Sequence, residues 1–179
     1  FKEALREGDI NYIVNEGITQ QEKGVHILDV NVGLPEIDED EMLVKSVKEL
    51  QSVLDLPLQL DTAKKSSMEK AMRIYNGKPL VNSVNGELES MEAVFPLVNK
   101  YGGTVIALAM DKNGIPETAE GRIAVAKRII EKAKEYGATI GVAHTNATYE
   151  KALEAVRWGA SAFTHTFNAM TPIHHRMPG

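Results

Sequence analysis

The sequence contains no cysteine, which excludes disulfide bonds, thiolate nucleophiles and cysteine-ligated zinc. This absence fits a reducing compartment and favours a cytoplasmic location. The apolar runs have only the length of β-strands, which argues against a segment that crosses a bilayer. No basic stretch followed by an apolar stretch stands near the start of the sequence, so no signal peptide is expected.

An excess of basic residues is also missing. The 179 residues include 20 basic and 25 acidic side chains, which gives a formal net charge of −5. This balance argues against nucleic acid or an anionic membrane as the main partner, because basic surfaces bind both. Apolar residues are plentiful: at 43% of the chain they suffice for a sizeable core in a single domain, expected to span residues 1–179.

Short apolar segments alternate with helical patterns along the chain. The clearest is KPLVNSVNG at residues 78–86, an apolar run that ends in two asparagines and a glycine. Further strands are expected within HILDVNVG, LPLQLDT, GTVIALAMD, ATIGVAHT and ASAFTHTF. Strands that alternate with helices indicate a parallel sheet with right-handed crossovers, so the polar residues at the strand ends should face the same way.

Helices are expected before and between these strands. Residues 1–24 carry apolar positions at helical spacing, and Pro35 with the acidic run after it should start the next helix. Pro96 should kink or shorten the helix that follows KPLVNSVNG. Thr118 is expected to be the N-cap of a long helix that ends near Gly137.

About six β/α units result, and they indicate an α/β fold built as a partial (β/α)8 barrel of the TIM type. A doubly wound sheet is the alternative, but it usually carries a glycine-rich phosphate loop after its first strand, and none follows the first strand here. Six units do not close an eight-stranded barrel. The chain is therefore expected to be a piece of a barrel, or to pair its open sheet edges with another copy as a homo-oligomer.

Polar side chains stand near the ends of the first four expected strands: Asp29, Asn31, Asp61, Asn82, Asn85 and Asp111. Carboxylates and amides with no basic residue among them suit a ligand that presents adjacent N–H donors, because each carboxylate can accept two hydrogen bonds in a fork. A 2-amino-4-oxo pteridine is such a ligand. The same residue types also end strands as turn formers and helix caps, and that interpretation stays open.

Four segments carry a family resemblance: HILDVNVGLPEIDE, LPLQLDT, GKPLVNSVNGELESMEAVFPLVNKYGG and ALAMDKNGIPETAEGRIAVAKRIIEKAKEYG. They are similar to the pterin-binding domain of the methyltetrahydrofolate–corrinoid methyltransferases, which includes the folate domain of cobalamin-dependent methionine synthase. The resemblance implies a (β/α)8 barrel that holds methyltetrahydrofolate at the carboxyl ends of its strands. It also implies that a separate corrinoid protein or domain takes the methyl group.

The same resemblance implies roles for individual residues. It assigns pterin contacts to Asp61, Asn82 and Asp111. Asp29 and Asn31 would line the same mouth of the barrel.

The last part of the chain, GVAHTNATYEKALEAVRWGASAFTHTFNAMTPIHHRMPG, resembles a different family. It is similar to N-acetylglucosamine-6-phosphate deacetylase, a metal-dependent amidohydrolase that is also a (β/α)8 barrel. This resemblance implies His144 and His165 as ligands of a divalent metal such as zinc. It also implies Asn168 and Ala169 as substrate contacts and Arg176 as a phosphate contact.

Both resemblances are partial. The early His-x-His or Glu metal motif and the late catalytic aspartate of the deacetylases are missing, so full deacetylase activity is not expected. The change of resemblance predicts a chimera of two barrels, with a pterin-binding-like segment at residues 1–137 and a deacetylase-like segment at 138–179. Three functions remain: a methyltransferase-like pterin-binding segment with little or no turnover, a chimeric or designed barrel scaffold without activity, and a metal-dependent deacetylase.

Overall fold

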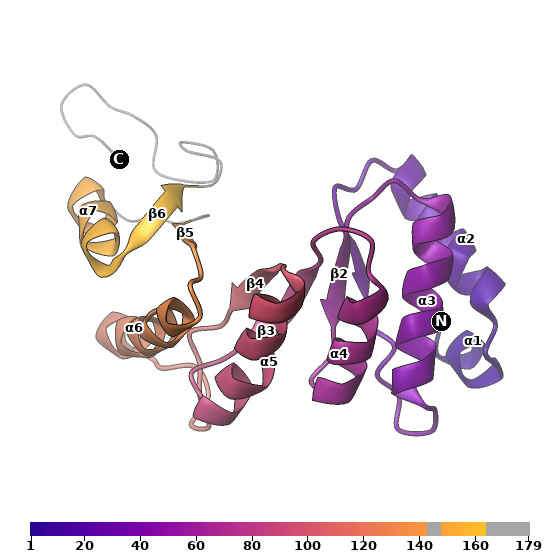
Figure 1. Ribbon diagram of the computed structural model, residues 1–179, viewed down its shortest axis with the longest axis horizontal. Helices are drawn as coiled ribbons and strands as arrows, with labels where there is room; N and C mark the ends of the chain where they lie inside the picture. Colours follow the sequence, from indigo (N-terminus) through magenta and orange to yellow (C-terminus); the bar gives the residue numbers. More distant parts are fainter. Residues whose placement is uncertain (143–147, 164–179) are drawn as a thin grey trace.

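The computed structural model describes residues 1–142 and 148–163, in which two N-terminal helices precede a regular alternation of strands and helices (Figure 1). The strands are β1 (Leu28–Val30), β2 (Leu58–Asp61), β3 (Leu80–Val84), β4 (Thr104–Ala107), β5 (Ile140–Val142) and β6 (Ala160–Phe163). The helices are α1 (Lys2–Glu7), α2 (Ile10–Glu22), α3 (Glu39–Val53), α4 (Lys65–Ile74), α5 (Leu88–Tyr101), α6 (Ala119–Glu135) and α7 (Tyr149–Trp158). Within these two ranges, no helix has the length and apolar character needed to cross a membrane.

Side-chain caps fix where the crossover helices begin. The carboxylate of Asp38 accepts a hydrogen bond from the backbone N–H of Glu41 at 3.2 Å, so α3 begins after Asp38. The acidic run expected at the start of this helix does supply its cap and first turn. Pro35, which was expected to start the helix with these acids, instead lies in the turn before the cap. The hydroxyl of Thr118 accepts from the N–H of Gly121 at 3.1 Å, which confirms Thr118 as the N-cap of α6.

Proline does not end α5. The helix continues through Pro96 to Tyr101 and stops at Gly102, whose φ of 80° suits glycine. Phe95 and Leu97, on either side of the proline, are both buried. Packing against the core therefore retains the helix, although proline removes one of its internal hydrogen bonds.

The first four strands form one parallel sheet in the order β1-β2-β3-β4. Each strand lies next to the one that precedes it in the chain, as in a barrel and unlike a doubly wound sheet. This order confirms the expected partial TIM-type architecture. Six parallel strands are present, as expected, and five of them are followed by a helix within the described residues. They are divided between two sheets, because β5 and β6 pair in parallel with each other.

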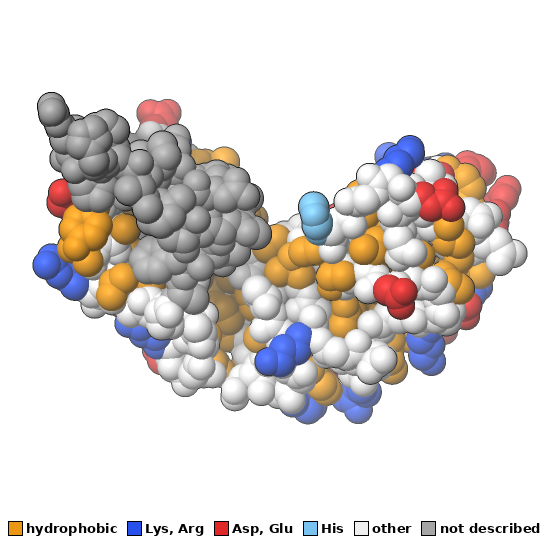
Figure 2. Space-filling view, turned by 90° about the horizontal axis from the view of Figure 1, so that it is seen from above, with side chains coloured by type: hydrophobic (Ala, Val, Ile, Leu, Met, Phe, Trp, Pro, Cys, Tyr) orange, Lys and Arg blue, Asp and Glu red, His pale blue; other side chains and the backbone are white. Residues whose placement is uncertain are grey.

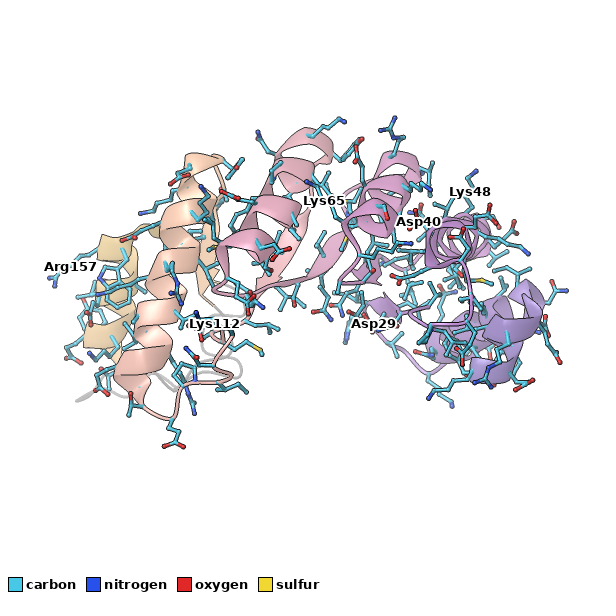
Figure 3. The ribbon with its side chains drawn as sticks, turned by 90° about the horizontal axis from the view of Figure 1, so that it is seen from below. Asp29, Asp40, Lys48, Lys65, Lys112 and Arg157 are labelled. Atoms are coloured by element: carbon cyan, nitrogen blue, oxygen red, sulfur yellow. The ribbon has the colours of Figure 1, made fainter. Side chains whose placement is uncertain are left out.

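The helices cover one face of the four-stranded sheet. Apolar strand residues point toward this face and are fully buried; they include Leu58, Leu60, Val81 and Val84. Side chains alternate along a strand, so the intervening residues face the other way. The helices follow an arc with Lys48 on its outer side and Asp29 on its concave side (Figure 3).

The concave side is the side that a complete barrel would enclose. Around the hollow, Figure 2 shows apolar side chains and a histidine among white surface of other side chains and backbone. Asp29, Gln59, Asp61 and Asn82 alternate with the helix-facing residues of their strands and are partly or fully exposed. The sheet therefore presents polar groups on its uncovered face and apolar groups to the helices.

Candidate functional site

Asp61, the last residue of β2, lies beside Asn82, the middle residue of β3. They are register partners in the parallel pairing of β2 with β3, and both side chains are half-buried. Both line a cavity of about 1020 Å³. Adjacent strands thus bring a carboxylate and a carboxamide to one hollow, as the sequence predicted, although Asn82 lies within its strand and not at its end.

The rest of this cavity, called the strand-end cavity below, comes from three places. Asn85 lines it from the turn after β3, and Lys65 and Leu88 line it from the first turns of α4 and α5. Leu108 and Met110 contribute apolar surface from the loop after β4. The strand-end cavity therefore combines apolar surface with many polar groups, which include the three glutamates Glu87, Glu89 and Glu92 at the start of α5.

Asn31 orients the carboxylate of Asp61. Its Nδ2 donates to Oδ2 of Asp61 at 2.8 Å, and its Oδ1 accepts from the backbone N–H of Gly33 at 3.0 Å. Both ends of the amide are thereby used, which fixes its orientation. In the described ranges no protein group donates to Oδ1 of Asp61, so this oxygen remains an acceptor for a ligand.

Asp29 is held by a neighbouring strand. Gln59, its register partner on β2, donates from Nε2 to Oδ1 of Asp29. Burial raises the pKa of Asp29, the hydrogen bond from Gln59 opposes this change, and the charge of Asp61 adds to it. Asp29 and Asp61 thus act on each other electrostatically on the concave face of the sheet.

Asn85 uses its side chain locally. Its Oδ1 accepts from the N–H of Glu87 at 2.9 Å, and its backbone N–H donates to the hydroxyl of Ser90 at 3.1 Å. These bonds form the turn between β3 and α5. For this residue the structure supports the role of turn former, which the sequence left open.

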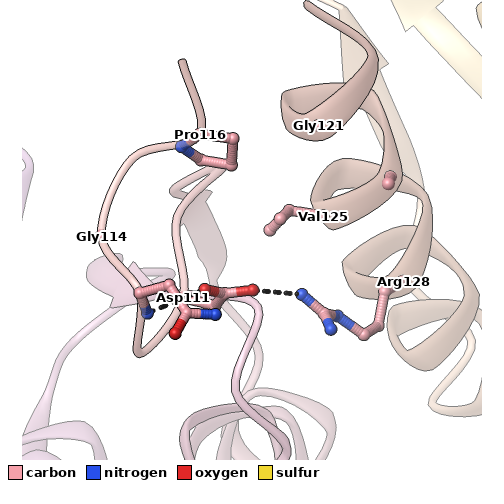
Figure 4. A pocket seen from close by; sticks show the side chains of 8 residues that line it. Asp111, Gly114, Pro116, Gly121, Val125 and Arg128 are labelled. Atoms are coloured by element: carbon pink, nitrogen blue, oxygen red, sulfur yellow. Dashed lines mark hydrogen bonds and ion pairs between the residues drawn. The ribbon is translucent and has the colours of Figure 1, made fainter. Parts of the chain in front are cut away.

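Asp111 lies beyond the end of its strand. The strand expected to end at Asp111 stops at Ala107, and Asp111 forms a tight turn with Gly114 through two backbone hydrogen bonds of 2.8 and 3.1 Å. Its Oδ1 accepts from the N–H of Asn113 at 3.0 Å, and its Oδ2 accepts from Nη2 of Arg128 at 2.9 Å (Figure 4). These two donors hold the pKa of Asp111 below its usual value.

Arg128 is a residue that the sequence reasoning missed. The strand-end acids were expected to have no basic residue among them, and for Asp111 this was wrong because α6 supplies Arg128. Asp111 and Arg128 line a cavity of about 390 Å³ between the loop after β4 and α6, next to the strand-end cavity. A spacing signal existed: Gly121, Val125 and Arg128 recur at helical intervals and face this loop.

A buried acid next to the site was missed as well. Asp40 in α3 is only 8% exposed and pairs with Nζ of Lys64 and of Lys70, each at 2.8 Å. These lysines, with the hydroxyl of Ser67, hold the pKa of Asp40 well below its usual range. Lys64 also lines a cavity of about 510 Å³ that contains Asn31 and Asp61. The sequence held one sign of this pair. A lysine at the N-terminus of a helix, such as Lys64 before α4, is unfavourable next to the positive end of the helix dipole unless an acidic side chain lies nearby.

The expected metal site cannot be placed. His144, His165, Asn168, Ala169 and Arg176 all lie outside the described residues. Within residues 1–142 and 148–163, no three side chains of His, Cys, Asp or Glu gather in a way that could hold a metal ion.

Comparison with known proteins identifies relatives of most of the chain. Residues 1–146 match the family described as pterin binding enzyme. Over 141 residues the chain is 32% identical to a methylcorrinoid:tetrahydrofolate methyltransferase of Eubacterium limosum, an alignment that covers 77% of this chain and 52% of that protein. It is 26% identical over 135 residues to the methionine synthase of Mycobacterium tuberculosis, covering 73% of this chain and 11% of that protein.

A second similarity involves a shorter part of the chain. Over 64 residues it is 42% identical to an N-acetylglucosamine-6-phosphate deacetylase of Lysinibacillus sphaericus, which covers 36% of this chain and 15% of that protein. Both resemblances inferred from the sequence are thus confirmed. The alignments to the methyltransferase and to the deacetylase together exceed the length of this chain, so they share residues. The chain spans about half the length of the methyltransferase.

Proposed function

Because the chain belongs to the family of pterin binding enzymes, we propose that its strand-end cavity binds the pterin ring of methyltetrahydrofolate. The observation that carries this proposal is the pairing of Asp61 with Asn82 on adjacent strands, in one cavity that also has apolar surface. A pterin ring presents an N–H and an amino group side by side, next to a carbonyl oxygen. A carboxylate can accept from both donors, and a carboxamide can donate to the oxygen.

The five residues assigned to the pterin site have different tasks in this proposal. Asp61 accepts the donors of the ring, and Asn82 binds its polar edge. Asn31 orients Asp61 through the hydrogen bond at 2.8 Å. Asp29 contributes charge from the concave face, while Asp111 supports the neighbouring loop.

Methyl transfer requires a partner that carries a corrinoid. The name of the Eubacterium limosum relative states that the corrinoid is methylated and that tetrahydrofolate takes part. We propose that a corrinoid protein or domain approaches the same cavity from the open side of the sheet. This chain would then bind and orient the folate, with little or no turnover when it acts alone.

Calorimetric titration of the chain with methyltetrahydrofolate tests the proposal. We expect saturable binding that weakens about ten- to a hundredfold in Asp61→Ala and in Asn82→Ala, because each change leaves polar groups of the ligand unpaired. Asn99→Ala, an exposed amide on α5, is the matched control and should bind like the parent chain. Absence of binding at millimolar ligand would remove the pterin proposal and leave a barrel scaffold without activity.

The similarity to a deacetylase supports a second candidate, a metal site formed by His144 and His165. Metal analysis of the purified chain tests it, with His144→Ala and His165→Ala as the matched variants. We expect bound zinc only if both imidazoles act as ligands. A chain that contains no metal and takes up no added zinc would end this candidate.

The two similarities also support a chimeric origin. We propose that the chain joins segments of two (β/α)8 barrels at α6, near residue 137, where the resemblance of the sequence changes. Relatives from two different families support this proposal, although their alignments share residues. The sequence of the parent gene decides this. A natural gene that runs unbroken across α6 in related organisms would contradict a recent joining.

A further inference from the structure

Both oxygens of the Asp111 carboxylate are already used within the protein. The N–H of Asn113 donates to Oδ1 at 3.0 Å, and Nη2 of Arg128 donates to Oδ2 at 2.9 Å. Each carboxylate oxygen can accept two hydrogen bonds, so these two bonds chiefly fix the direction of the Asp111 carboxylate, toward its own turn and α6. Asp111 differs from Asp61 in position: Asp61 lines the strand-end cavity, whereas Asp111 lines the smaller cavity next to it.

Three segments of the chain meet immediately behind Asp111. The N–H of Gly86, in the turn after β3, donates to the carbonyl of Met110 at 2.8 Å. A Cβ at Gly86 would lie 2.5 Å from Cγ1 of Val125 and 2.9 Å from Nη2 of Arg128. The turn, the loop after β4 and helix α6 are therefore in direct contact, and only glycine fits between them.

This junction separates two cavities. Asn85 and Met110, the chain neighbours of Gly86 and Asp111, line the strand-end cavity. Val125 and Arg128 line the smaller cavity on the other side (Figure 4). A movement of the loop at Asp111 would therefore move a wall of the strand-end cavity.

We propose that the Asp111–Arg128 ion pair is a latch that positions Met110 and Asn85 for the pterin, and that Asp111 does not itself contact the ligand. This inference rests on the proposed pterin-binding function. Arg128 and Asp111 are then positioning residues that act through the loop after β4.

Because the Asp111–Arg128 pair is partly exposed, its effect on the loop can be distinguished from an effect on the stability of the whole protein. The side chain of Arg128 is 51% exposed and that of Asp111 is 19% exposed. Ion pairs with such access to water add little to global stability. Breaking the pair should therefore loosen the loop and leave the melting temperature nearly unchanged.

Hydrogen exchange in the ligand-free chain tests the latch without any assumption about the ligand. The amides of Asp111, Asn113 and Gly114 all donate within this turn. We expect them to exchange about tenfold faster in Arg128→Ala and near the parent rate in Arg128→Lys, which keeps the charge. Arg73→Ala, which removes an exposed ion pair on α4, is the matched control and should leave these amides unchanged. Unchanged exchange in Arg128→Ala would overturn the latch.

Methyltetrahydrofolate titration then distinguishes the latch from a direct contact. We expect Arg128→Ala and Asp111→Ala each to weaken binding about tenfold, and Arg128→Lys, which keeps the charge opposite Asp111, to bind near the parent affinity. A loss of about a hundredfold or more in Asp111→Ala, with a tenfold loss or less in Arg128→Ala, would show that Asp111 contacts the ligand, which overturns this inference and leaves the proposed function intact. A parent chain that binds no methyltetrahydrofolate contradicts the proposed function and, with it, the role of the latch in pterin binding.

Discussion

Asn31 and Asp61 are joined across two strands by a hydrogen bond of 2.8 Å from Nδ2 to Oδ2. The amide comes from just beyond β1, and the acid is the last residue of β2. Because Oδ1 of Asn31 accepts from the backbone N–H of Gly33, the Asn31 amide is held in the orientation that points Nδ2 at Asp61. The strand-end acid that faces the strand-end cavity is thus fixed by a residue of the neighbouring β/α unit.

Replacing Asn31 by alanine should weaken methyltetrahydrofolate binding about tenfold, because Asp61 loses the bond that orients it. Calorimetric titration at constant pH measures the change. Asn99→Ala serves again as the control for loss of an exposed amide. Equal affinity of Asn31→Ala and the parent chain would mean that Asp61 needs no orientation from β1.

The acid Asp40 should make stability depend on pH. Its pKa lies below the ordinary value of 3.8, chiefly because of Lys64 and Lys70. A lowered folded-state pKa means that the stabilisation is present above the unfolded-state pKa and is lost as the pH falls through the folded-state pKa. Asp40→Asn should therefore melt at a lower temperature than the parent at pH 7, with a difference that shrinks below about pH 4.

Thermal unfolding, followed by circular dichroism from about pH 2 to about pH 7, measures this difference, because carboxylates titrate within this interval. Asp55→Asn is the matched control, because Asp55 is exposed and makes no ion pair in the described ranges. A gap between Asp40→Asn and the parent that stays constant down to the lowest pH would contradict the role of the ionised carboxylate.

The effect of the ionised Asp29 carboxylate on stability should have the opposite sign to that of Asp40. Burial raises its pKa from 3.8, so the ionised form is disfavoured in the folded state. The destabilisation is present at neutral pH and is relieved as the pH falls through the raised pKa. Asp29→Asn keeps an oxygen for Gln59 and removes the charge, so it should melt at a slightly higher temperature than the parent at pH 7 and at a similar temperature at pH 3. A lower melting temperature at pH 7 would show that the charge of Asp29 is needed.

Self-association is expected at β4, which is the last strand of the four-stranded sheet and has an open edge in the described part of the chain. In the described ranges no strand pairs with this edge, and open parallel edges invite partners. We expect light scattering to give a mass above the 19.6 kDa of one chain, rising with concentration. Thr104→Lys, which places a charge at the exposed start of β4, should shift the mass toward the monomer, whereas Lys48→Arg on the helix side should not. A monomeric parent chain at all concentrations would contradict the prediction.

The sequence was a reliable guide to local structure. The run that ends in Asp61 and the run from Leu80 to Val84 have the length of buried strands, and Thr118 stands at the start of a periodic helix. These features depend on neighbouring residues, so periodicity and capping preferences suffice to predict them. The pairing of Asp61 with Asn82 also followed from sequence, since parallel order brings successive strand ends together.

What the sequence could not predict depends on contacts between distant segments. Arg128 reaches Asp111 from a helix 17 residues later, and no local pattern states that the two meet. The strand before Asp111 ends early because Asp111, Asn113 and Gly114 close a turn of their own. The separation of β5 and β6 from the first sheet likewise depends on long-range pairing that the order of elements does not determine.

The sequential order of the first four strands has a consequence for how this protein tolerates change. Each of the helices α2 to α5 packs mainly on the helices directly before and after it, so the structure grows by stepwise addition along the chain. Removing or exchanging a terminal unit in such an architecture disturbs a single interface, as in a stacked array of repeats. The polypeptide is in this sense modular, and its crossover helices are the natural points at which one ancestor can be spliced to another.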